Sequence, residues 1–135
     1  MSDLRHVLLV DDDPATNFIN RKIITDSGCA DIITTVTSAE AALEFLVSTK
    51  ESEKDQPDLI LLDINMPGMN GWEFLEEYKD LDEEQKAKIV IVMLTTSLNP
   101  DDEERARKNP LVNGFKNKPL NPIAIKDILE NYFNK

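Results

Sequence analysis

Acidic side chains follow two apolar segments of this sequence, at the point where each segment ends. The segment Leu59–Leu62 runs directly into Asp63, and the mostly apolar segment Leu4–Val10 runs into three aspartates, Asp11, Asp12 and Asp13. Short apolar runs of this kind are typical of strands that are buried on both faces of a sheet. Open α/β sheets bind their ligands at the C-terminal ends of such strands, so these carboxylates stand where chemistry is expected.

Two further polar residues follow segments of the same kind. Thr95 comes directly after the apolar run Ile89–Leu94, and Lys118 ends a more polar fifth segment within Leu111–Lys118. Taken singly, an aspartate pair is usually a helix cap, and a threonine or a lysine usually belongs to a turn or a surface loop. Their arrival together at four strand ends favours one shared site on the rim of a sheet.

Several carboxylates on one rim repel one another. At about 4 Å and an effective dielectric constant near 20, each pair costs roughly 4 kcal/mol. Such a cluster must protonate, splay apart or hold a cation. Hard oxygen ligands select magnesium, manganese or calcium, and a few carboxylates completed by water suit octahedral Mg²⁺.

A carboxylate beside a divalent cation and an ammonium group can act as a nucleophile toward phosphorus. Thr95 offers a hydroxyl group, and Lys118 offers a mobile positive charge suited to phosphate oxygens. The metal and Lys118 would offset negative charge on the transferring group. These residues therefore predict the formation and hydrolysis of an aspartyl phosphate.

Helices are predicted between the strands that carry these residues. Their expected starts are Asp13-Pro14, the capping-box-like Thr37-Ser38-Ala39-Glu40, the segment before Trp72, Asn99-Pro100 and Asn121-Pro122. Strand and helix then alternate five times, which implies a parallel sheet with helices on both faces. The predicted fold class is α/β, a doubly wound, flavodoxin-like, five-stranded parallel sheet with strand order 2-1-3-4-5. The half-polar segments Asp31–Val36 and Leu111–Lys118 are expected at its edges.

Two expectations concern individual side chains. Phe18, Ile19, Ile23 and Ile24 fall near helical spacing, which indicates the apolar face of the first helix. His6 is the only histidine. It is expected near the exposed entrance of the first strand and outside any site.

The composition limits the domain count, the location and the partners. A chain of 135 residues suits one domain, expected to span 1–135. Its formal net charge of -11 disfavours nucleic acid and anionic membrane surfaces as partners, and no segment approaches the length of a membrane span. Cys29 is the only cysteine, and the N-terminal residues lack a secretory signal pattern, so a cytoplasmic location is expected.

Four stretches together resemble the signature of the response-regulator receiver domain, the family of the bacterial chemotaxis response regulator. They are V-D-D-D-P, L-L-D-I-N-M-P-G-M-N-G, L-T-T-S and F-K-N-K-P, and the resemblance covers almost the whole chain. It implies a signalling switch rather than an enzyme. Such a two-component response regulator accepts a phosphoryl group, with Mg²⁺, from a phosphohistidine on a sensor histidine kinase or a histidine phosphotransfer protein.

The resemblance also implies roles for the acidic rim. Asp63 matches the phosphoacceptor, and Asp12 matches the direct metal ligand. Asp11 matches the acidic neighbour that holds metal-bound water, and Asn65 matches the residue that gives its backbone carbonyl to the metal. Asp13 falls one place beyond the acidic pair and is expected to cap the first helix.

The remaining matches concern the switch and its readout. Thr95 matches the switch hydroxyl that turns toward the phosphoryl group, and Lys118 matches the lysine that pairs with phosphate. Phe115 matches the aromatic switch position, and because it has no hydroxyl group it would switch by packing alone. The readout expected from the family is a shift on the face of the fourth helix, fifth strand and fifth helix. The target protein is left open, as is the choice between a monomer and a phosphorylation-dependent dimer.

Other functions compete with a switch that binds a target protein. The domain could instead be an intermediate that passes its phosphoryl group along a phosphorelay, or a receiver that serves only as a scaffold. A metal-dependent phosphatase for small molecules is disfavoured because Ile64 and Asn65, rather than a second acid, follow Asp63. A flavin- or nucleotide-binding module is disfavoured because no glycine-rich phosphate loop follows the first strand.

Thr96 follows the switch threonine, at a position where the family commonly has a small residue. We hypothesise that its bulk hinders the water that hydrolyses the aspartyl phosphate and so prolongs the phosphorylated state. Thr96→Ala is then expected to lose its phosphoryl group faster, as followed by intact mass after the donor is removed. An unchanged rate of loss in this variant would contradict the hypothesis.

Overall fold

Five parallel strands form one sheet in the order β2-β1-β3-β4-β5. They belong to a computed structural model of the chain that describes residues 4–49, 56–81, 89–96, 99–118 and 120–133. The strands are β1 (Leu4–Val10), β2 (Ala30–Val36), β3 (Leu59–Asp63), β4 (Val90–Thr95) and β5 (Gly114–Asn117). β1, β3 and β4 are buried almost throughout, whereas β2 and β5 are half-exposed. The predicted fold class and strand order are confirmed, with the half-polar strands at the edges.

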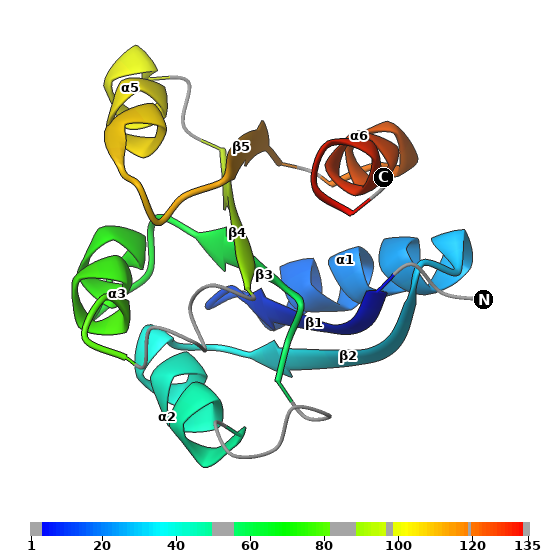
Figure 1. Cartoon of the computed structure of the whole chain (residues 1–135), viewed down its shortest axis with the longest axis horizontal. Coiled ribbons are helices and arrows are strands. Elements are labelled where there is room, and N and C mark those ends of the chain that lie inside the picture. Colours follow the sequence, from blue (N-terminus) through cyan, green and yellow to red (C-terminus); the bar gives the residue numbers. More distant parts are fainter. Residues whose placement is uncertain (1–3, 50–55, 82–88, 97–98, 119, 134–135) are drawn as a thin grey trace.

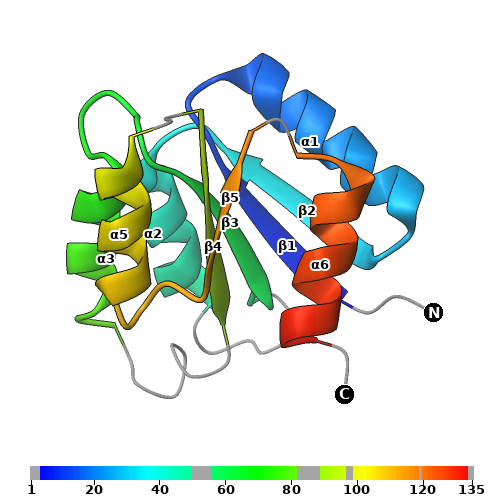
Figure 2. The same cartoon turned by 90° about the horizontal axis from the view of Figure 1, so that it is seen from above.

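Helices cover both faces of the sheet (Figures 1 and 2). On one face lie α1 (Pro14–Ser27) and α6 (Pro122–Tyr132), and on the other lie α2 (Ala39–Thr49), α3 (Gly71–Tyr78) and α5 (Pro100–Lys108). The fourth helix expected from the sequence is α5, and the fifth is α6. Because strand side chains alternate between the faces, an apolar cluster forms under each helical layer. Burial on both faces accounts for the continuous apolar runs in the central strands.

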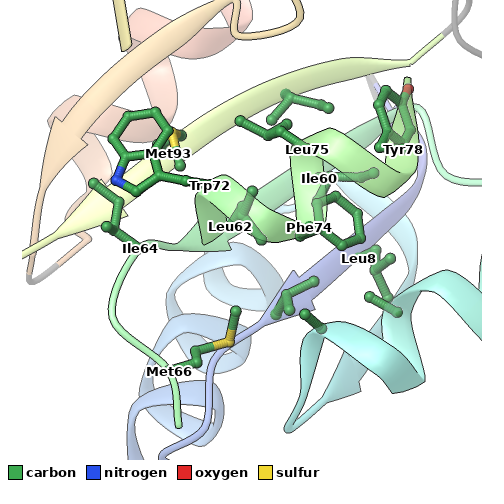
Figure 3. Packing of buried hydrophobic residues seen from close by; sticks show 14 of the residues in the cluster. Leu8, Ile60, Leu62, Ile64, Met66, Trp72, Phe74, Leu75, Tyr78 and Met93 are labelled. Carbon is green, nitrogen blue, oxygen red and sulfur yellow. The ribbon is translucent and has the colours of Figure 1, made fainter. Parts of the chain in front are cut away.

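The larger apolar cluster is centred on α3. Figure 3 shows Trp72, Phe74, Leu75 and Tyr78 of this helix lying over the central strands. The rings of Phe74 and Tyr78 stack with their centroids 5.8 Å apart. Fully burying one such aromatic side chain contributes roughly 1.5–3 kcal/mol, so α3 is firmly anchored next to the end of β3.

Side-chain caps and one glycine set the ends of α1. The Asp13 side chain accepts a hydrogen bond from the backbone N–H of Ala15 at 3.0 Å, and Pro14 occupies the first helical position, as predicted. The helix ends at Gly28, whose φ of 68° is the left-handed conformation that favours glycine. Asparagine side chains cap α3, α5 and α6 in the same way, at Asn70, Asn99 and Asn121.

The start of α2 differs from the prediction. The Oγ atom of Ser38 accepts a hydrogen bond from the backbone N–H of Ala41 at 3.0 Å, so Ser38 caps this helix. The predicted capping box joining Thr37 and Glu40 is therefore wrong by one position. With Ser38 as the cap, Ala41 occupies the third helical position, and its side chain cannot complete a box.

The buried face of α1 also differs from the prediction. Phe18 and Ile19 are 70% and 51% exposed, whereas Asn17, Asn20 and Ile24 are buried. The buried residues follow the three- and four-residue spacing of one helical stripe, and each residue turns the helix by about 100°, so Phe18 and Ile19 point away from it. Asn17 and Asn20, rather than Phe18 and Ile19, therefore lie on the buried side of α1.

His6 is buried, with only 3% of its surface exposed, so its predicted exposed position is wrong. Its Nε2 atom lies 2.7 Å from the hydroxyl group of Thr34 on β2. Its ring meets the ring of Phe45 on α2 edge to face, with the centroids 5.5 Å apart. The second half of α2 covers the entrance of β1, which strand periodicity alone does not reveal.

The charged loop expected at 51–56 lies outside the described residues, apart from Gln56, which is buried. Across the part of the chain that the structure describes, no helix combines the length and the apolar character needed to cross a bilayer.

Gly71 should tolerate no side chain, because a Cβ there would lie 2.6 Å from the carbonyl oxygen of Asp63 and 3.0 Å from the Cα of Ile64. Both are backbone atoms at the end of β3, so Gly71→Ala should lower the free energy of unfolding by about 3 kcal/mol in urea denaturation. Gly28→Ala is the control. No atom of the described residues lies within 4 Å of a Cβ at Gly28, so left-handed strain alone costs about 1 kcal/mol. Equal losses in the two variants would contradict the steric argument.

Candidate functional site

Three carboxylates meet at the C-terminal ends of β1 and β3. In the register of the two strands Val10 is opposite Leu62, so the aspartates that follow are brought together. One carboxylate oxygen from each of Asp11, Asp12 and Asp63 lies within 4.8 Å of the others. Asp11 and Asp63 are buried, and Asp12 is exposed. The structure therefore assembles the acidic cluster that the sequence predicts.

Lys118 reaches this cluster from the end of β5. Its Nζ atom lies 2.5 Å from Oδ2 of Asp11 and 3.1 Å from Oδ1 of Asp63. Its backbone N–H donates a hydrogen bond of 2.8 Å to the carbonyl oxygen of Thr95 at the end of β4. The lysine thus joins the ends of four strands, β1, β3, β4 and β5, with its ammonium group between two buried carboxylates.

Burial and charge oppose each other in the site. The pKa of the Asp63 carboxyl group is raised to about 6, chiefly by burial; the hydrogen bond from Lys118 opposes this rise, and the negative charge on Asp11 adds to it. Burial disfavours the charged form of Lys118, but its hydrogen bonds to Asp11 and Asp63 outweigh burial and raise its pKa. One ammonium group thus faces three carboxylates, and the surplus negative charge suits a divalent cation held by oxygen atoms.

Hydrogen bonds between side chains and the backbone hold the turn after β1. The backbone N–H of Asp13 donates to Oδ1 of Asp11 at 2.9 Å, and the side-chain amide of Asn17 donates to the carbonyl oxygen of Asp11 at 2.9 Å. Asn17 was not a predicted site residue. The signal in the sequence was its spacing from Ile24, seven residues or about two helical turns, which places a polar side chain on the buried stripe of α1.

The predicted switch residues lie on neighbouring strands. Thr95 is fully buried at the end of β4, and Phe115 of β5 is half-buried opposite Met93. Because side chains alternate along strands, Thr95 and Phe115 belong to the set that faces α5. A cavity of about 230 Å³ lies beside Phe115, lined by residues of α5 that include Ala106.

Two predicted residues are less constrained. Asn65 is exposed in the loop two residues after Asp63, and its backbone carbonyl remains a predicted metal ligand. Thr96 is exposed directly after β4, on the rim.

Asp63 should make the folded protein less stable when it ionises. The pKa of Asp63 rises from an ordinary 3.8 in the unfolded chain to about 6 in the folded protein. The contribution of this group to the free energy of unfolding is therefore complete below pH 3.8 and is lost as the pH rises through 6. In urea denaturation near pH 7.5, without divalent ions, Asp63→Asn should raise the free energy of unfolding by about 2–3 kcal/mol, a gain that shrinks toward pH 4.

Asp13→Asn is the control for this measurement. The Asp13 carboxylate lies in the same turn, but a side-chain hydrogen bond from Thr16 lowers its pKa, so removing its charge should bring no gain near neutral pH. A loss of stability in Asp63→Asn near pH 7.5 would contradict the assigned sign.

The comparisons with known proteins agree with this geometry. A family model, "Response regulator receiver domain", matches residues 7–130. The probable methanogenesis regulatory protein FilR2 of Methanothrix harundinacea is 32% identical over 124 residues, which cover 92% of this chain and 78% of that protein. A two-component response regulator from Cytophaga hutchinsonii shares the fold with a TM-score of 0.91 at 34% identity, with 98% of each chain covered. For the chemotaxis protein CheY4 of Vibrio cholerae the TM-score is 0.73 at 26% identity, with 95% of this chain and 98% of that chain covered.

The sheet order, the acidic rim and the matched family all identify one kind of domain. Since the family model spans most of the chain, the protein belongs to the response regulator receiver domains, the signalling switches of two-component systems.

Proposed function

We propose that this protein is a cytoplasmic response regulator that is phosphorylated on Asp63. The phosphoryl donor is the phosphohistidine of a sensor histidine kinase or a histidine phosphotransfer protein. The observation that carries the proposal is the ammonium group of Lys118 between Asp11 and Asp63, with the Asp12 carboxylate in the same cluster. An acceptor carboxylate, a cation site and a mobile positive charge are the parts that phosphoryl transfer to a side chain requires.

The residues that would hold Mg²⁺ are Asp11, Asp12, Asp63 and the backbone carbonyl of Asn65. When bound, the ion supplies positive charge that offsets the negative charge of the transferring group. The acidic cluster fits such an ion, because its three carboxylates offer hard oxygen ligands within one ion's reach.

Asp63 acts as the nucleophile. A bond forms between a carboxylate oxygen of Asp63 and phosphorus while the phosphorus–nitrogen bond of the donor breaks, and the imidazole leaves with the bonding electron pair. Lys118 is positioned to offset the negative charge of the transferring phosphoryl group, since its Nζ atom already lies 3.1 Å from Oδ1 of Asp63. Water then attacks phosphorus in the return reaction, which releases phosphate and restores the carboxylate.

The response is transmitted to the face formed by α5, β5 and α6. On phosphorylation Thr95 turns toward the phosphoryl group, and Phe115 moves within the cavity beside it. A second connection supports output through α5. The guanidinium group of Arg105 on α5 lies 4.4 Å from the ring centroid of Trp72, the second residue of α3, which follows the loop after Asp63. The target is a protein that distinguishes the two states of this face.

Acetyl phosphate with MgCl₂ should add one phosphoryl group to the protein, as measured by intact mass, and Asp63→Asn should add none. Lys118→Gln should slow phosphorylation about 100-fold, because one donor to the transferring charge is lost. Lys116→Gln is the matched control, since Lys116 lies on β5 only two residues before Lys118 but pairs with Asp127 of α6. It should react at the wild-type rate.

Two outcomes would contradict the proposal. One is phosphorylation that persists in Asp63→Asn. The other is an equal loss of rate in the two lysine variants.

A further inference from the structure

Asn17 is a buried polar residue near the start of α1, with 4% of its surface exposed. Its Nδ2 atom donates one hydrogen bond to the carbonyl oxygen of Asp11 at 2.9 Å and another to that of Val36 at 3.1 Å. Only the amide nitrogen can donate to two carbonyl oxygens, so the orientation of the side chain is fixed. The amide therefore ties the first turns of α1 to the ends of β1 and β2.

The other atom of the same amide has no such partner. Oδ1 of Asn17 is buried, and no described residue hydrogen-bonds to it. A buried acceptor without a partner destabilises a fold, whereas an apolar side chain of similar size would carry no such cost. Stability alone therefore does not account for an asparagine here, and its two donated hydrogen bonds need another explanation.

The bond to Asp11 acts on the residue that follows it. The carbonyl oxygen of Asp11 belongs to the planar peptide group that joins Asp11 to Asp12, so fixing that oxygen fixes the direction in which the chain reaches Asp12. The Asp12 carboxylate is exposed and makes no hydrogen bond to the described residues. Its place in the acidic cluster consequently depends on the backbone that carries it.

The side chain and the N–H of Asp11 do not replace this contact. Oδ1 of Asp11 accepts from the backbone N–H of Asp13, Oδ2 accepts from Lys118, and the backbone N–H of Asp11 donates to Val36 at 3.2 Å. The bonds of Oδ2 and of the N–H hold Asp11 on its own side of the Asp11–Asp12 peptide, and the bond from the Asp13 N–H closes a turn around Asp12 without contacting that peptide group. Among the hydrogen bonds of the described residues, the bond from Asn17 is the one made to the carbonyl oxygen of the peptide itself.

We propose that Asn17 is a positioning residue that aims the Asp12 carboxylate at the divalent cation. This inference rests on the proposed function, because it assumes that the acidic cluster holds a metal ion. Partners that orient metal ligands typically contribute 10–100-fold to metal affinity. Asn17 would do so through the backbone, without contacting the ion.

The test measures Mn²⁺ affinity, with free Mn²⁺ followed by electron paramagnetic resonance in the absence of any phosphoryl donor. Asn17→Ala removes both donors, and Asn17→Ser keeps one donor group on a shorter side chain. Asn20→Ala is the matched control, because Asn20 is equally buried on the same helix and 3% exposed. Urea denaturation of each variant reports the loss of stability separately from the loss of affinity.

We expect Asn17→Ala to weaken Mn²⁺ binding by about tenfold or more, and Asn17→Ser to lie between it and the wild type. Asn20→Ala should lose stability yet bind Mn²⁺ as the wild type does. If Asn17→Ala does not fold, the comparison of Asn17→Ser with Asn20→Ala decides the matter.

Wild-type affinity in the Asn17 variants, or an equal loss in Asn20→Ala, would overturn the positioning role and leave the proposed function intact. A wild-type protein that binds no Mn²⁺ would overturn both.

Discussion

The ammonium group of Lys118, held between two buried carboxylates, is the interaction on which the arrangement of the site depends. Neighbouring central strands end in Asp11 and Asp63, so the sheet brings together groups whose mutual repulsion costs roughly 4 kcal/mol per pair at an effective dielectric constant near 20. Lys118 offsets only part of this repulsion, because burial still raises the pKa of Asp63 to about 6. The remaining negative charge makes the rim receptive to a cation, and a bound cation would in turn make it receptive to a phosphoryl group.

The rim is tied to the rest of the fold through backbone contacts. The N–H of Gly71 donates to the carbonyl oxygen of Ile64 at 2.8 Å, and the chain is too close there to admit a Cβ. A shift in the loop after Asp63 would therefore reach the start of α3 directly. Trp72 is the next residue, and the guanidinium group of Arg105 on α5 packs over its ring. A single contact therefore connects the start of α3 to α5. Short, stiff connections of this kind can convert a local change of charge into movement of a distant helix.

Most of the fold could be predicted because its signals act over a few residues. The apolar runs locate the central strands, and Asp13 and Asn121 mark helix starts, since a cap needs only the backbone of its own first turn. Side-chain placement was harder to predict. Phe18 is exposed and His6 is buried because α1 turns another face to the sheet and α2 covers the entrance of β1, and neither fact is local.

The local sequence patterns establish which residues end the strands, and hence that Asp63, Thr95 and Lys118 lie on one rim of an α/β sheet. How these side chains meet depends on the folded arrangement of the whole chain. Lys118 and Asp11 are 107 positions apart, yet their side chains are 2.5 Å apart, because strand register and the covering helices set distances that no local pattern encodes. The same holds for Asn17, whose two carbonyl partners belong to the ends of two different strands. A contact between distant segments depends on the packing of every element between them, and that packing exists only once the chain has folded.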